Sequence, residues 1–130
     1  MFLPLISANF QPECAAYEMN DTMDQAWGPL IMGVSYRTYL CSYDPVDWYY
    51  FDVLRAGALS VDLLVPAKAD LDLSVLAADG SIVAESLTRD EGVDEHVIAV
   101  LQTVGRYYVR VLPFSRRDAS QPYSLTINFF

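Results

Sequence analysis

The stretch DLDLSVLAADGSIVA, residues 70–84, decides the fold class of this chain. In its first half, leucine and valine occupy every second position, and a side-chain period of two is that of a β-strand. Asp79-Gly80 follows, a dipeptide that favours a tight β-hairpin turn because both residues tolerate a positive φ. The apolar run Ile82-Val83-Ala84 then supplies the returning strand. Residues 70–84 therefore predict an antiparallel pair of strands.

Similar alternating runs continue on both sides of this hairpin. They are separated by turn-like segments at intervals of roughly ten residues, a spacing typical of a β-sandwich or barrel. A short helical turn is expected at residues 22–26, where Asn20, Asp21 and Thr22 offer capping side chains. The pattern predicts an all-β, antiparallel sandwich of about eight strands. Besides the hairpin, strands are expected at residues 34–40, 48–54, 59–65, 96–101, 106–112 and 123–129.

Composition limits the classes of function. The 130 residues suit one domain, and an apolar share of 53% excludes an intrinsically disordered chain. A net charge of −9 repels phosphate backbones, so we expect no nucleic-acid partner. No apolar run approaches the about 20 residues of a membrane-spanning helix, and we expect no membrane span. An acidic surface favours solubility and can also bind divalent cations.

The residues that enzymes use are sparse here. His96 is the single histidine and lies in the middle of an expected strand, which excludes a histidine-rich metal site. A catalytic triad would need His96 beside a serine such as Ser74 or Ser86, and no nucleophile-elbow motif accompanies either serine. The acidic residues gather near turns, where we expect them to be solvated. We therefore expect no enzymatic activity.

Five short motifs occur in an order that resembles the bacterial pre-peptidase C-terminal domain. The first, YEMNDT, has Met19 where proline is usual in that family. The resemblance covers residues 17–130 and leaves residues 1–16 as an apolar N-terminal extension. It implies a jelly-roll-like β-sandwich without catalysis, appended to secreted bacterial proteases and other exported proteins. The motifs are YEMNDT (17–22), DPVDWYYF (44–51), the hairpin at residues 70–80, GRYYVRV (105–111) and PYSL (122–125).

The same resemblance implies a calcium site. Related collagen-binding domains of clostridial collagenases bind calcium through the segment that corresponds to residues 17–22 and through the acidic loop before the aromatic strand. Ca²⁺ takes about six to eight oxygen ligands from carboxylates, amides and carbonyls. An acidic residue is expected two positions before Glu18, where this chain has Ala16. In the alternative, Asn20 and Asp21 cap a turn and the aspartates of the acidic loop are solvated. The implied calcium ligands are Glu18, Asn20, Asp21, Asp44 and Asp47.

Two cysteines flank the segments that this site would join. If residues 17–22 pack against the acidic loop as the resemblance implies, Cys14 and Cys41 come close enough for a disulfide bond. Secretion would favour the bond, because disulfides persist in oxidising compartments. The alternative is two free buried thiols.

Two further surfaces are candidates for partners. Aromatic side chains on strand faces opposite the expected core can bind an extracellular protein or a glycan, although a slip of one residue would bury them instead. These aromatics are Tyr39, Trp48, Tyr50 and Tyr108. The apolar N-terminal residues could add a strand to their own sandwich or to the edge of a neighbouring copy. These assembly residues are Phe2, Leu3, Leu5, Ile6 and Phe10.

The sequence thus predicts a secreted or cell-surface, non-catalytic module for protein interaction, adhesion or assembly, with calcium as its candidate cofactor. The alternative is a structural subunit of an extracellular filament that polymerises by exchange of its N-terminal strand. The expected partners are accordingly an extracellular protein or glycan surface, or other copies of the chain itself.

Overall fold

The computed structural model describes residues 16–40, 46–116 and 121–130. These residues form eight strands and one short 3-10 turn, η2 (Met23–Gln25), which lies inside the helical turn expected from the sequence. The strands are β1 (Ser35–Thr38), β2 (Asp47–Val53), β3 (Gly57–Leu64), β4 (Asp70–Ala77), β5 (Ile82–Ser86), β6 (Glu95–Leu101), β7 (Gly105–Arg116) and β8 (Tyr123–Phe129). Among the described residues, no helix has the length and apolarity needed to cross a bilayer.

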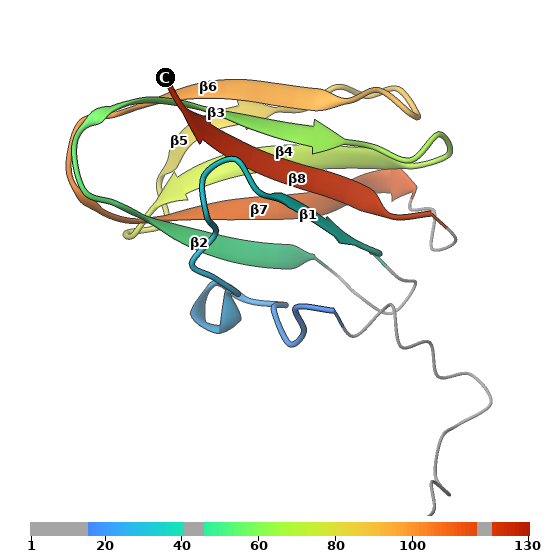
Figure 1. Ribbon diagram of the computed structural model, residues 1–130. Helices are drawn as coiled ribbons and strands as arrows, with labels where there is room; N and C mark the ends of the chain where they lie inside the picture. The colour runs from blue at the N-terminus through green and yellow to red at the C-terminus, as the bar shows by residue number, and fades with distance from the viewer. Residues whose placement is uncertain (1–15, 41–45, 117–120) are drawn as a thin grey trace, which may run out of the picture.

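The strands form two four-stranded sheets, ordered β1-β8-β3-β6 and β2-β7-β4-β5. Every neighbouring pair is antiparallel. Figure 1 shows the sheets stacked as two layers. Strand β1 pairs with β8, β2 with β7, β3 with β6 and β4 with β5, which is the nested pairing of a jelly roll. The predicted fold class is therefore confirmed.

The core lies between the two sheets, and alternation predicted most of its side chains. Tyr49 and Phe51 of β2 face inward with Val109 and Val111 of β7, and none of the four exposes measurable surface. Burial of such side chains stabilises the fold by about 1.5–3 kcal/mol each. Val34 departs from the expected pattern: β1 begins after it, and its side chain is exposed.

The hairpin at residues 77–82 forms as predicted. Gly80 has a φ of +88°, a conformation that glycine adopts without a steric penalty. The Asp79 carboxylate accepts hydrogen bonds from the Ser81 backbone N–H at 2.9 Å and from the Ser81 hydroxyl at 2.6 Å. The side chains of the turn therefore stabilise the connection between β4 and β5. The pairing of the two strands shifts register between Val75 and Leu76.

The expectation that the acidic residues are solvated is wrong for four of them, all of which are buried: Asp47, Asp70, Asp72 and Glu95. Strand β4 is a central strand of its sheet, and the loop between β5 and β6 lies over it. Arg89 in that loop donates two hydrogen bonds to Asp72, at 2.9 and 3.0 Å. Glu95 accepts hydrogen bonds from the Ser86 hydroxyl and from the Thr88 backbone N–H. Loop contacts, which alternation does not report, therefore cover Asp72 and Glu95.

Residues 16–30, called the arm below, run beside β2 at the edge of its sheet (Figure 1). The Trp27 backbone N–H donates to the Trp48 carbonyl, and the Tyr50 N–H donates back to the Trp27 carbonyl at 3.0 Å. The Leu30 N–H donates to the Tyr50 carbonyl at 2.8 Å. These bonds satisfy backbone groups that an edge strand would otherwise expose.

Candidate metal centre

The arm brings its polar residues to the beginning of β2. The Trp48 backbone N–H donates to the Asn20 carbonyl oxygen at 2.8 Å. The Tyr17 ring packs beside Trp27, with 4.5 Å between the ring centres, and lies 6.1 Å from the Tyr49 ring. Tyr17 has a φ of +64°, which is unfavourable for a residue with a Cβ atom. The contacts of its ring with Trp27 and Tyr49 offset the cost of this conformation.

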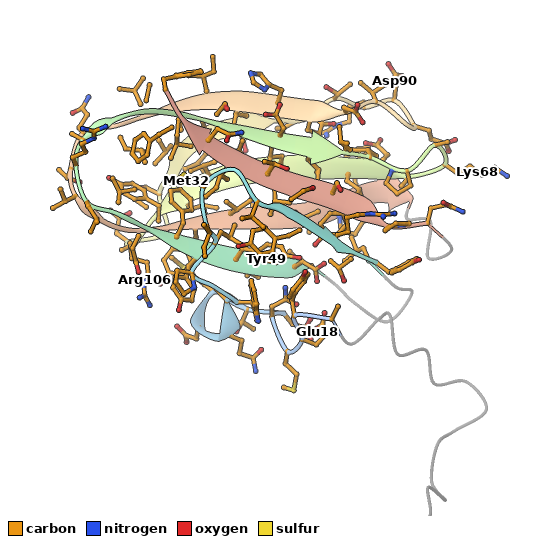
Figure 2. The ribbon with its side chains drawn as sticks, in the orientation of Figure 1. Glu18, Met32, Tyr49, Lys68, Asp90 and Arg106 are labelled. Carbon is orange, nitrogen blue, oxygen red and sulfur yellow. The ribbon has the colours of Figure 1, made fainter. Side chains whose placement is uncertain are left out.

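Three carboxylates meet where the arm touches β2. Glu18 and Asp21 come from the arm and Asp47 from the first position of β2, and one ligand oxygen of each lies within 4.8 Å of the others. Figure 2 places Glu18 on the arm side of β2. Asp47 is buried, whereas Glu18 and Asp21 are half-buried. Like charges at this separation repel each other, and a bound cation would remove that cost.

A buried amide belongs to the same segment. Asn20 exposes no surface, and neither its Oδ1 nor its Nδ2 has a hydrogen-bond partner among the described residues. The same holds for Oδ1 of Asp21. A buried polar atom without a partner costs about 1–3 kcal/mol. Oxygens of amides and carboxylates are the ligands that a hard cation prefers, so the residues present fit such an ion.

Hydrogen bonds through two buried tyrosines connect Asp47 to the core of the sandwich. The Tyr123 hydroxyl donates to Asp47 Oδ2 at 2.6 Å, and the Tyr49 and Tyr123 hydroxyl oxygens lie 2.5 Å apart. Burial raises the pKa of both hydroxyls well above the usual value, and the Asp47 charge adds to the effect. Both tyrosines therefore stay protonated at neutral pH and act as hydrogen-bond donors. Alternation in the strands expected at residues 48–54 and 123–129 predicts that Tyr49 and Tyr123 face inward, but it does not report that their hydroxyls meet Asp47.

The structure brings together Glu18, Asp21 and Asp47 of the calcium ligands implied by the sequence, with Asn20 in the same segment. The fifth, Asp44, lies outside the described residues. The same is true of the two cysteines of the expected disulfide, Cys14 and Cys41, and of the assembly residues Phe2, Leu3, Leu5, Ile6 and Phe10. The disulfide and the strand exchange therefore stay predictions.

Three of the four candidate surface aromatics share one face. Trp48, Tyr50 and Tyr108 are half-buried on the outer face of the sheet that contains β2 and β7, and Tyr50 lies opposite Tyr108. The Arg106 guanidinium lies 3.9 Å from the centre of the Tyr50 ring, a cation–π contact. Tyr39 does not join this face, because it follows β1, which belongs to the other sheet.

His96 has an ordinary structural environment. It lies on the exposed outer side of β6, where its Nδ1 is 2.6 Å from Oδ1 of Asp62 on β3. Ser74 lies on β4 in the other sheet, and the Ser86 hydroxyl donates to Glu95. The structure therefore places neither of the serines that a triad would need beside His96.

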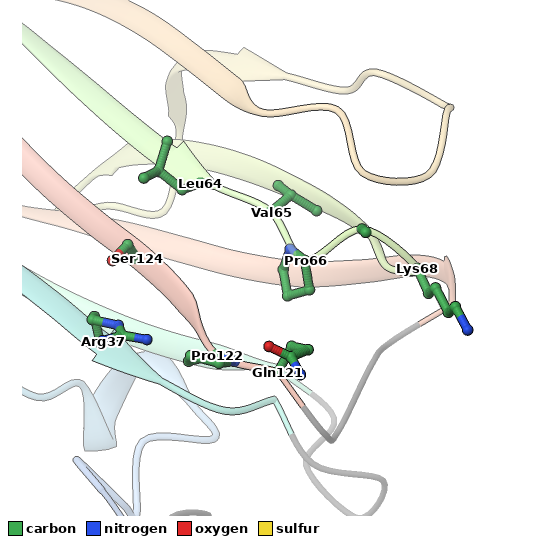
Figure 3. A pocket seen from close by; sticks show the side chains of 9 residues that line it. Arg37, Leu64, Val65, Pro66, Lys68, Gln121, Pro122 and Ser124 are labelled. Carbon is green, nitrogen blue, oxygen red and sulfur yellow. The ribbon is translucent and has the colours of Figure 1, made fainter.

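A shallow hollow of about 840 Å³ lies at the ends of β1, β3 and β8. Arg37, Pro66 and Pro122 are among the residues that line it, and Lys68 extends away from it in Figure 3. None of the candidate site residues lines this hollow. It is therefore separate from the carboxylate cluster.

Comparison with known proteins places the chain in a family and supports its fold. Residues 45–113, just over half of the chain, match the family described as bacterial pre-peptidase C-terminal domain. The structure resembles the pre-peptidase C-terminal domain of collagenase from Bacillus anthracis, with a TM-score of 0.59 and 16% sequence identity over 75% of this chain and 90% of that domain. A weaker likeness, with a TM-score of 0.46, links it to PliG, a periplasmic inhibitor of g-type lysozyme from Aeromonas hydrophila, at 11% identity over 81% of this chain and 95% of that protein.

At 16% identity, the likeness to the collagenase domain concerns the fold alone. The family match rests on the sequence and extends from the acidic loop before β2 into β7. It includes Asp47 of the carboxylate cluster and the hairpin between β4 and β5. This chain belongs to the bacterial pre-peptidase C-terminal domain family.

Proposed function

We propose that this chain is a non-catalytic interaction module of an exported protein and that a calcium ion fastens its arm to the sandwich. The observation that carries the proposal is the meeting of Glu18, Asp21 and Asp47 beside the buried, unpartnered amide of Asn20. Membership of the family supports the non-catalytic role, since its domains are non-catalytic modules. Export is tested by immunoblotting fractions of the producing bacterium, and protein confined to the cytoplasm would contradict it.

The donor set selects the kind of ion. Among the described residues the cluster contains carboxylates and no histidine or cysteine, so a hard cation fits better than zinc or copper. Ca²⁺ accepts an irregular shell of about six to eight oxygens, whereas Mg²⁺ demands near-octahedral geometry and gives up its waters reluctantly. Glu18, Asn20, Asp21 and Asp47 would hold the ion, and Asp44 is a further candidate. Bound calcium would supply the positive charge that offsets the repulsion of the carboxylates.

Thermal unfolding tests the calcium site. A ligand that binds only the folded state stabilises it by about 2.7 kcal/mol at a concentration of 100 times its Kd. We expect excess calcium to raise the unfolding midpoint and EDTA to lower it, with a much smaller effect of magnesium. The double variant Glu18→Gln, Asp21→Asn should lose this response. Asp62→Asn, which changes a carboxylate on the outer face of β3, should keep it. An equal midpoint in calcium and in EDTA for the unsubstituted chain would refute the site.

The outer face of β2 and β7 is the proposed interaction surface. Its support is the half-exposure of Trp48, Tyr50 and Tyr108 on one rigid sheet, since aromatic side chains supply much of the contact energy in interfaces. An extracellular fibrous protein is the proposed partner class, and fibrillar collagen is the first probe.

Co-sedimentation measures this interaction. We expect the chain to pellet with collagen fibrils and Tyr108→Ser to remove most of the pelleted protein. His96→Ala, on the outer face of the opposite sheet, should pellet like the unsubstituted chain. If Tyr108→Ser pellets equally well, the assignment of this face is wrong. Pelleting with an insoluble polysaccharide but not with collagen would replace the proposed partner by a glycan.

A further inference from the structure

Strand β6 forms one edge of the sandwich, because the sheet order β1-β8-β3-β6 ends with it (Figure 1). The backbone groups on the open side of an edge strand can pair with a strand of another chain. The side chains of Ile98 and Val100, on the outer face of β6, are 53% and 63% exposed. These apolar side chains therefore lie along an edge, where a second chain could reach both them and the backbone.

One hydrogen bond shows which backbone groups of β6 point away from its neighbour β3. The N–H of Phe130, which follows β8, donates to the Ala58 carbonyl at 3.1 Å, so Ala58 directs its backbone groups toward β8. Alternate residues of a strand bond to opposite sides, so the odd-numbered residues of β3 face β6 and pair there with its odd-numbered residues. The N–H and C=O groups of His96, Ile98 and Val100 therefore point to the open side. Within the described part of the chain, no backbone hydrogen bond from outside the sheet reaches them.

The other three edges of the two sheets carry features that oppose pairing with another chain. The arm lies along β2, where Trp27 forms a bridge with Tyr49. Strand β5 has five residues, one of which is Glu85, and its pairing with β4 shifts register. Strand β1 has four residues and includes Arg37. Strand β6 instead runs for seven residues in unbroken register with β3, and its exposed side chains carry no charge unless His96 is protonated.

The sequence of β6 is complementary to itself in an antiparallel pair. When two copies of β6 pair about Ile98, all seven residues of each strand find a partner. Ile98 then faces Ile98 of the other copy, and Val100 faces His96. The backbone groups that point to the open side meet in this register as hydrogen-bonded pairs. Although each chain carries a net charge of −9, no like charges face each other across this pair.

We propose that β6 joins two copies of this chain into a two-fold symmetric dimer. The two four-stranded sheets that end with β6 then continue into each other across the interface. A two-fold interface uses the same patch on both partners and closes, so assembly ends at the dimer. This pairing is independent of the proposed calcium site and of any exchange of the N-terminal residues.

The dimer has a consequence for the interaction surface proposed above. Residues that face each other across an antiparallel pair lie on the same side of the sheet, so both copies turn the outer face of β2 and β7 in the same direction. Two linked sites on one extended partner bind more tightly than one, without any new contact. This consequence rests on the proposed function, whereas the dimer itself does not.

Sedimentation equilibrium of the chain and of two lysine variants tests the proposal. From about 1 µM to about 1 mM, the range of weak association, the unsubstituted chain should pass from monomer towards dimer. Ile98→Lys places like charges opposite each other at the two-fold axis, so the dissociation constant of the dimer should rise by roughly 10-fold or more. Ile82→Lys is the matched control: Ile82 is 51% exposed on β5, and the variant has the same net charge. It should dimerise like the unsubstituted chain.

Amide hydrogen exchange, followed by NMR at low and at high protein concentration, locates the interface. In the dilute monomer, the N–H groups of Ile98 and Val100 should exchange fast, and those of Val97 and Ala99, which bond to β3, should exchange slowly. At high concentration the Ile98 and Val100 groups should slow as well, because the dimer gives them hydrogen-bond partners. If a dimer forms while these two groups still exchange fast, its interface lies elsewhere and the proposal is wrong.

The sedimentation data can contradict the dimer in three ways. A chain that stays monomeric over the whole range overturns the proposal and leaves the edge of β6 to a strand of another protein. Species larger than a dimer also overturn it, because a two-fold interface closes; they would favour exchange of the N-terminal strand instead. Equal dissociation constants for Ile98→Lys and Ile82→Lys would show that the contact between the copies does not involve β6.

Discussion

The Arg89 guanidinium donates to both carboxylate oxygens of Asp72, at 2.9 and 3.0 Å, and lies 3.8 Å from the centre of the Phe114 ring. These contacts attach the loop between β5 and β6 to the outer face of β4 and β7. The loop is held at two further points. The Gly92 N–H donates to the Ala69 carbonyl, and the Asp94 carboxylate accepts a bond from the Val65 N–H, each at 2.8 Å. Arg89 thus makes one of several contacts that attach this loop to the sandwich.

Arg89→Met should destabilise the protein, because it leaves the buried Asp72 carboxylate without its charged partner. The loss of a partner by a buried polar group costs about 1–3 kcal/mol. Arg89 is 46% exposed, so water screens the pair and the lower half of that range is expected. Denaturant unfolding measures the change. Arg89→Lys keeps the charge but loses the planar guanidinium that lies over the Phe114 ring, and its stability should fall in between. Equal stability of Arg89→Met and the unsubstituted chain would show that the contact contributes nothing.

Asp72 and Asp79 should respond to acid in opposite ways. Burial raises the pKa of Asp72 above its usual 3.8, against the opposing charge of Arg89. The folded state therefore binds the Asp72 proton more tightly than the unfolded state does. As the pH falls from the raised pKa towards about 3.8, protonation of Asp72 increases the free energy of unfolding. Hydrogen bonds from Ser81 lower the pKa of Asp79. Above about pH 3.8, the ionised Asp79 carboxylate stabilises the folded state. This contribution is lost as the pH falls through the lowered pKa.

Carbon-13 NMR titration of the side-chain carboxyls measures this contrast directly. Asp72 should take up its proton at a higher pH than Asp79. In Arg89→Met the pKa of Asp72 should rise further, since the neighbouring positive charge that lowers it is gone. The reverse order of the two midpoints in the unsubstituted chain would contradict the burial of Asp72.

Gly28→Ala should weaken the attachment of the arm. An added Cβ at Gly28 would overlap the Tyr50 carbonyl oxygen and lie 3.0 Å from two carbons of the Tyr50 ring. The Tyr50 backbone cannot move aside by a change of rotamer. We therefore expect the free energy of unfolding to fall by about 1–3 kcal/mol and the stabilisation by calcium to weaken. Gly57→Ala is the control, because its Cβ would meet the Phe129 ring at an ordinary 3.4 Å. Thermal unfolding with and without calcium measures both, and equal melting of the two variants would contradict the close packing at Gly28.

His96→Ala should change stability little, although its distance of 2.6 Å to Asp62 is short. The two side chains are 54% and 44% exposed, and exposed ion pairs contribute about 0–1 kcal/mol. Where His96 is protonated, the small effect should shrink further in 1 M salt, because charges are then screened within about 3 Å. If the free energy of unfolding, measured with denaturant, fell by more than about 2 kcal/mol in His96→Ala, His96 would have a role that its position on the surface does not suggest.

The sequence by itself determined the strands and most of the side chains that fill the core. Alternation at residues 49, 51 and 53, and the Asp79-Gly80 turn, are properties of a few consecutive residues, because a strand turns successive side chains to opposite faces. The arrangement of Glu18, Asp21 and Asp47 was anticipated through family motifs rather than through the pattern of residues alone. Strand bounds agreed to within a few residues, apart from β7, which continues to Arg116.

Only the tertiary structure decided which polar groups meet. Asp72 and Glu95 are buried because a distant loop covers them, and Tyr123 reaches Asp47 because β8 and β2 face each other across the core. The separation of Tyr39 from Trp48 and Tyr50 likewise follows from the assignment of β1 to the other sheet. The alternation within one strand predicts which face of the sheet a side chain occupies. Which residue that side chain contacts depends on how the two sheets stack, and the stacking is a property of the whole chain.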